Sequence, residues 1–120
     1  MTDRELLEKA AKAAGYKVYD WLPNLGFAID VPWKHGLSNV DRWNPLTDDG
    51  DALRLAVKLH VELEHNQPQD QHLYVAAFRC GCEMLYAPVN SVEELEDEPQ
   101  RPAATRRAIV RAAAAIGEKT

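Results

Sequence analysis

The sequence predicts an α+β fold, in which a mainly antiparallel β-sheet is flanked by helices as an α/β/α sandwich. Two observations lead to this class. Three segments with helical spacing of apolar residues lie near positions 3–14, 48–59 and 102–117, and the segments between them are rich in aromatic and β-branched residues. Three helices are enough to cover both faces of a sheet. We therefore expect the order α-β-α-β-β-α, in a single domain spanning residues 1–120.

The first helix is expected at about residues 3–14. Thr2 and Glu5 have the spacing of a capping box, in which each side chain satisfies a backbone N–H group that the helix leaves free. Gly15 suits the end of the helix, because glycine accepts the left-handed conformation without penalty. Strand structure is expected in the runs YKVYDWL and NLGFAIDV, with turn residues at Pro23 and Asn24. The two runs form either one strand with an interruption or a short hairpin.

The second helix begins within the run WNPLTDDGDALRLAVKL, residues 43–59. A long polar loop covering residues 32–46 precedes it. Thr47 is the expected N-cap, and three aspartates follow in the first turn, where carboxylates oppose the positive end of the helix dipole. A chemical role for this acidic cluster, Asp48, Asp49 and Asp51, is the alternative. The stripe expected to be buried comprises Leu53, Ala56, Val57 and Leu59 or His60.

Residues 61–88 have the pattern of an antiparallel meander of two or three strands. VELEH alternates apolar and acidic residues, NQPQDQ is a hairpin loop, and HLYVAAFRC and CEMLYAPV are further strands with Gly81 between them. The next run, SVEELEDE, predicts either a short helical turn or an acidic loop. Pro102 suits the first turn of the last helix, and Gly117 is expected to end that helix.

The composition is that of a globular protein, with 46% hydrophobic and 28% charged residues. No apolar run approaches the ~18 residues that span a bilayer, and the first residues lack the apolar core of a signal peptide. We therefore expect a cytoplasmic protein. The net charge is -5, with nine acidic groups and one basic group in residues 61–98. This acidity makes nucleic-acid binding an unexpected function.

Two sequence blocks are distinctive: WNPLTDDGDA at 43–52 and TRRAIVRAAAAIG at 105–117. Together with the leading helix they resemble the phage ABA-sandwich domain family, small proteins of tailed phages and prophages. The resemblance covers nearly the whole chain and implies a sheet sandwiched between helix layers. It implies no mechanism, because no established activity comes with the family. The RCGC run at 79–82 and the acidic run at 93–98 depart from the family's pattern.

Candidate metal ligands are Cys80 and Cys82, near the three histidines His60, His65 and His72. Structural zinc sites usually present a CxxC knuckle, whereas this C-x-C run has no second pair to match it. A Cys–His nucleophile and magnesium bound by the aspartate cluster are further alternatives. The sequence lacks the phosphate-binding patterns GxxxxGK[ST] and GxGxxG that such magnesium chemistry would need. We therefore expect no cofactor, and an enzyme is expected less than a binding protein.

Candidate binding residues lie on two surfaces. The last helix carries a basic stripe, Arg101, Arg106, Arg107 and Arg111. The stripe either pairs with the acidic run 93–98 and with solvent, or forms a site for an anion or an acidic partner. Trp33 and His35 lie in the polar loop, where an exposed tryptophan would anchor a partner. Trp43, directly before the second helix, is instead expected to fill the core.

Three functional hypotheses follow. The first is a non-enzymatic phage or prophage accessory protein that binds a host or phage protein in the bacterial cytoplasm, through the surfaces that contain Trp33, His35, Arg106, Arg107 and Arg111. The alternative is a protein that binds or sequesters a nucleotide or other small anion, held by arginines in a pocket between a helix layer and the sheet. A metal-dependent enzyme ranks third.

Overall fold

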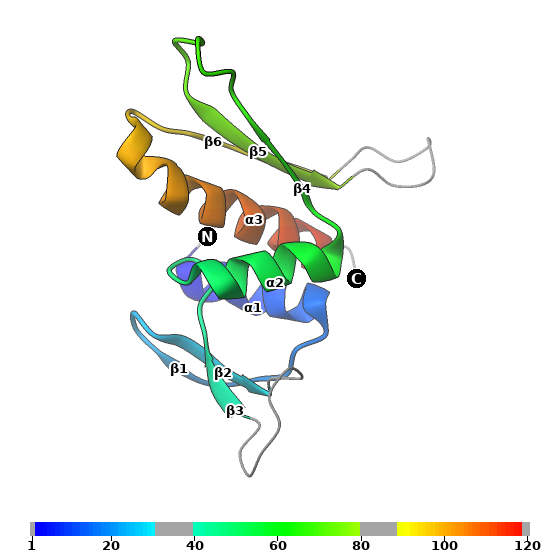
Figure 1. Cartoon of the computed structure of the whole chain (residues 1–120). Helices are drawn as coiled ribbons and strands as arrows, with labels where there is room; N and C mark the ends of the chain where they lie inside the picture. The colour runs from blue at the N-terminus through cyan, green and yellow to red at the C-terminus, as the bar shows by residue number, and fades with distance from the viewer. Residues whose placement is uncertain (1, 31–39, 80–88, 119–120) are drawn as a thin grey trace.

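A computed structural model describes residues 2–30, 40–79 and 89–118 of the chain. Within these residues, three α-helices and two three-stranded antiparallel sheets make up the α+β fold that the sequence predicts. Figure 1 shows the three helices together in the middle of the molecule, with one sheet on either side of them. Among the described helices, none has the length and apolar character needed to cross a membrane.

Helices α1 and α2 lie close to their predicted positions. Helix α1 spans Asp3–Ala14, with the Thr2 side chain accepting a hydrogen bond from the Glu5 N–H and Gly15 in the left-handed conformation at its end. Helix α2 spans Asp49–Leu59. Its N-cap is Asp48 and not Thr47, because the Asp48 carboxylate accepts the hydrogen bond of the Asp51 N–H group at 2.8 Å.

The first sheet contains β1 (Val18–Leu22), β2 (Gly26–Asp30) and β3 (Val40–Trp43), paired in that order. Strands β1 and β2 form the short hairpin that was one of the two alternatives for residues 16–31, the other being a single interrupted strand. Strand β3 was not predicted, since it lies inside the segment 32–46 that was expected to be loop. It forms by pairing with β2, where Phe27 stands opposite Trp43 and Asp30 opposite Val40. Nothing within VDRW marks a strand before a partner is known.

The second sheet contains β4 (Glu62–His65), β5 (Tyr74–Arg79) and β6 (Val89–Glu94), again paired in sequence order. The expectation of a helical turn or loop at 91–98 is wrong for its first half, because residues up to Glu94 pair with β5. A short 3-10 helix, η1 (Glu98–Gln100), follows. The predicted strand CEMLYAPV lies outside the described residues except at Val89.

Helix α3 (Arg101–Glu118) connects the layers. It packs along α1, against part of α2, and against β5 and β6 of the second sheet. Gly117 does not end the helix as expected. It lies within α3 and is buried, and a Cβ atom there would overlap the backbone carbonyl of Lys9 in α1. The glycine is therefore a contact point that allows α1 and α3 to approach closely.

The layer order differs from the expected α/β/α sandwich, although the α+β class is as predicted and the element order matches roughly, with three strands where one was expected before α2 and three where two were expected after it. The larger core combines α1, α2 and α3 with the first sheet, including Phe27, Ile29 and Trp43. A smaller core joins α3 to the second sheet through Ala108, Ala112, Val75 and Ala77. Because α3 is buried on two sides, one helical layer serves two separate sheets.

Candidate functional site

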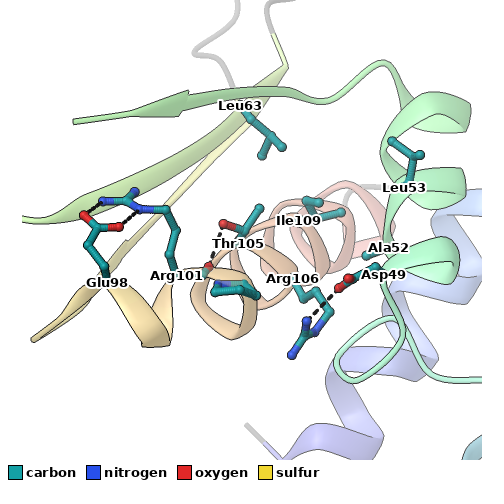
Figure 2. A pocket seen from close by; sticks show the side chains of 10 residues that line it. Asp49, Ala52, Leu53, Leu63, Glu98, Arg101, Thr105, Arg106 and Ile109 are labelled. Atoms are coloured by element: carbon teal, nitrogen blue, oxygen red, sulfur yellow. Dashed lines mark hydrogen bonds and ion pairs between the residues drawn. The ribbon is translucent and has the colours of Figure 1, made fainter. Parts of the chain in front are cut away.

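A cavity of about 490 Å³ opens between α2, α3 and β4. Figure 2 shows Ala52 and Leu53 projecting from α2, Leu63 from β4, and Thr105 and Ile109 from α3. Helix α3 packs against β5 and β6 of the second sheet. Strand β4, at the edge of the same sheet, borders the cavity. The described part of the chain thus leaves a wedge between α2 and β4 that no other element fills.

The walls of this wedge are apolar and exposed. The exposed fractions are 63% for Leu53, 66% for Val57 and 40% for Leu63. Leu53 and Val57 are four residues apart, so they lie next to one another on the outer surface of α2. The sequence-based expectation that both belong to the buried stripe is wrong. The buried positions of α2 are instead Asp51, Ala52, Leu55, Ala56 and Leu59.

A second hollow of about 550 Å³ continues the first toward the end of α2. It is lined by Val57 and His60 of the helical end and by Glu62 of β4, and it shares Leu53 and Leu63 with the first cavity. We call the two hollows together the α2–β4 groove. Its apolar walls suit burial of an apolar group, which is the main source of affinity at such surfaces.

Arg101 closes one end of the groove. Its guanidinium group donates to both carboxylate oxygens of Glu98, at 2.7 and 3.0 Å, and to the side chain of Asn66 at 2.7 Å. It also donates to the Tyr74 carbonyl and lies 2.9 Å from Nδ1 of His65. The hydrogen bond from Arg101 lowers the pKa of Glu98, and the same bond raises the pKa of Arg101. Figure 2 shows the paired side chains of Arg101 and Glu98 at this end of the groove, which is polar.

Arg106 forms the other polar boundary. Its Nη1 pairs with the Asp49 carboxylate at 2.7 Å, and its Nε donates to the Leu46 carbonyl at 2.8 Å. These bonds join α3 to the start of α2. Asp49 is paired with Arg106 and therefore has a structural role. This agrees with the structural interpretation of the aspartate cluster rather than with a chemical role for it.

The four arginines of the predicted basic stripe do not gather around one point. Arg101 and Arg111 pair with Glu98 and Glu93 of the acidic run, as one of the two alternatives predicted. Arg106 pairs with Asp49 in α2, and Arg107 pairs with Asp3 in α1. The stripe is therefore a set of contacts from α3 to other elements, and only Arg101 and Arg106 border the groove.

The remaining predicted site residues divide into described and undescribed ones. Trp33, His35, Cys80 and Cys82 lie outside the described residues. Trp43 fills the core as expected, with 1% of its surface exposed, and its ring stands nearly perpendicular to the Tyr16 ring, with the two centroids 5.7 Å apart. Within residues 2–30, 40–79 and 89–118, no group of three or more His, Cys, Asp or Glu side chains is arranged to hold a metal ion.

Comparisons with models of protein families, with curated proteins and with solved structures found no match. The groove is thus the feature of the described residues on which a functional argument rests. Sequence reasoning missed it because α2 and β4, which follow one another in the chain, enclose the first cavity only together with residues of α3 some forty positions later. The signals that existed were the apolar pair Leu53 and Val57 and the lone Leu63 between two glutamates.

Proposed function

We propose that this protein is a non-enzymatic binding protein, and that its α2–β4 groove takes an apolar segment of another protein. The exposure of Leu53, Val57 and Leu63 around one cavity is the observation that carries the proposal. Contiguous apolar surface of this kind, bordered by polar residues, is typical of interaction sites. Burying it would be favourable by roughly 25 cal/mol for each Å² of apolar surface removed from water.

The polar borders of the groove support this function over catalysis. Arg101 and Arg106 are each held by a carboxylate and by a backbone carbonyl. A partner segment could therefore enter the apolar part without displacing charged groups. The energetic centre of such an interface is an apolar anchor in a pocket, surrounded by polar residues that exclude water.

The setting proposed for this activity comes from the sequence resemblance. A small phage or prophage accessory protein would work in the cytoplasm of the bacterial host and would bind a host or phage protein there. The sequence blocks at 43–52 and 105–117 are the support for this setting. Their roles in the fold, as the start of α2 and the body of α3, explain them as structural features as well.

Native mass spectrometry of protein purified gently from a bacterial host tests the function. The comparison uses wild type, Leu53→Asp in the groove, and Leu25→Asp in the turn between β1 and β2, where Leu25 is also exposed. We expect a bound protein in wild type and Leu25→Asp that is lost from Leu53→Asp. A partner that remains on Leu53→Asp would show that another surface binds it.

A second candidate function is binding of a small amphiphilic anion. The cavity volume of about 490 Å³ falls within the usual size of ligand pockets, and two guanidinium groups border it. A thermal shift panel of nucleotides and other organic anions tests this candidate. Stabilisation that grows with ligand concentration in wild type, and is lost in Arg101→Gln, would favour it over a protein partner.

A further inference from the structure

Strand β4 is an edge strand that borders the groove. It pairs with β5 on one side and has no strand on its other side among the described residues. The α2–β4 groove lies along this edge, since Glu62 and Leu63 line it. An edge strand presents unpaired backbone groups that can accept a further strand.

The hydrogen-bond pattern shows which backbone groups are available. The Asn66 N–H donates to the Tyr74 carbonyl, which makes these two residues a hydrogen-bonded pair of the antiparallel ladder. Such pairs alternate along the strands. The residues with N–H and C=O groups directed to the open edge are therefore Leu63 and His65, which stand opposite Ala77 and Val75.

The side chains of β4 alternate in the same register. Leu63 lines the cavity and lies on the inner face of the sheet, the face that also carries the buried Ala77 and Val75 of β5. Glu62 and Glu64 lie on the outer face and are exposed. Among the described residues neither glutamate has an ion pair or a side-chain hydrogen bond. The edge thus offers one apolar position between two unpaired carboxylates.

We infer that an extended, basic segment of the partner protein adds to β4 as a fourth strand. The inference rests on the proposed function and specifies how the partner binds. Its inward side chain beside Leu63 would be apolar and would enter the cavity, and its outward neighbours opposite Glu62 and Glu64 would be lysine or arginine. Opposite charges stabilise cross-strand pairs, and main-chain hydrogen bonds supply affinity in this mode of recognition.

The carboxylates also indicate what does not bind here. A second copy of the chain adding through the same edge would bring Glu62 and Glu64 close to their own counterparts, and like charges directly opposite each other are unfavourable. The residues 61–98 are strongly acidic, with nine acidic groups and one basic group. Charge complementarity therefore selects a basic partner segment over self-association.

A short capped peptide of alternating lysine and valine is a suitable probe, titrated into isotope-labelled protein and followed by NMR. We expect the amide signals of Leu63 and His65 to shift and their hydrogen exchange to slow. Methylating the peptide's backbone nitrogens on one edge removes its donors, so affinity should fall tenfold or more. Glu64→Lys should weaken binding roughly fivefold. Glu94→Lys, a matched change on the opposite edge strand β6, should leave it unchanged.

The results separate this inference from the proposed function. Binding that Leu53→Asp abolishes but that survives peptide methylation would overturn strand addition while leaving the groove as a binding site. Equal weakening by Glu64→Lys and Glu94→Lys would reduce the effect to general charge attraction and would also overturn it. If the lysine–valine peptide does not bind, the inference of strand addition is wrong. The proposed function is tested separately, by native mass spectrometry of the protein purified from a bacterial host.

Discussion

The Asp51 carboxylate accepts a hydrogen bond from the backbone N–H of Asn44 at 3.0 Å, and both residues are buried. The same carboxylate accepts a bond from Arg54 at 3.0 Å. Asn44 in turn holds the Leu46 N–H with its side chain. The hydrogen bonds of Asp51 and Asn44 therefore fix the path of the chain from β3 into α2.

Removing the Asp51 carboxylate should destabilise the fold. Asp51→Ala leaves the buried N–H of Asn44 without its acceptor, so the free energy of unfolding should fall by about 2 kcal/mol. Asp51→Asn keeps an acceptor in place and should cost less. Urea denaturation measures both changes. Asp20→Ala, at an exposed position, is the control and should change stability by no more than about 0.5 kcal/mol. Equal stability of Asp51→Ala and wild type would contradict a stabilising role for the hydrogen bond between Asn44 and Asp51.

Gly117→Ala should weaken the packing of α1 on α3. The added methyl group would overlap the Lys9 carbonyl, so the helices must separate, at a cost of about 1–3 kcal/mol. Gly50→Ala is the matched control in α2, because its methyl group would meet side-chain atoms of Asp48 and Arg54 at 3.2–3.4 Å and no backbone atom that close. Thermal unfolding should show a lower Tm for Gly117→Ala alone. A similar loss for both variants would indicate a general effect of losing glycine.

Arg106 and Arg107 are neighbours in sequence with different expected effects. The Arg106 side chain is 19% exposed and makes short bonds to Leu46 and Asp49. Arg106→Ala should therefore reduce the free energy of unfolding by about 1.5 kcal/mol. Arg107 is 42% exposed and reaches Asp3 at 3.3 Å, so Arg107→Ala should cost no more than about 0.5 kcal/mol. Equilibrium denaturation of the two variants side by side checks this order.

The contact between Glu98 and Arg101 should weaken in acid. The Arg101 hydrogen bond lowers the pKa of Glu98 in the folded state, so the folded protein holds this carboxylate charged more strongly than the unfolded chain does. The stabilisation is complete above the pKa of the unfolded carboxyl and is lost as the pH falls through the lowered pKa of Glu98. An NMR titration of the Glu98 carboxyl carbon should show a low midpoint that rises in Arg101→Gln. An unchanged midpoint would contradict the assigned cause.

The helices were predictable because their signals are local. Thr2 and Gly15 mark both ends of α1, and the aspartates mark the start of α2 to within one residue. The burial of Trp43 followed from its place before the helix. Local signals failed for Leu53 and Val57, because apolar spacing alone does not say which side of a helix meets the core.

Strands β3 and β6 and the groove depend on distant partners. Val40–Trp43 becomes a strand by pairing with β2, and the acidic Glu93 and Glu94 join a sheet through β5. The groove forms because Leu53, Leu63 and Ile109 line the same cavity. No sequence pattern within one segment predicts that these three residues lie close together. The separation into two sheets likewise depends on α3 having two buried sides.

The position of α3 has a consequence for how the chain acquires its structure during synthesis. The helix contacts α1 across about a hundred intervening residues, as the pair Arg107 and Asp3 illustrates. A nascent chain that has reached only residue 100 would hold α1 with its main partner still missing. Long-range contacts of this kind slow folding and leave apolar surface open to aggregation meanwhile. The packing of α1, of α2 and of the second sheet against α3 can therefore form only after residues 101–118 have been translated.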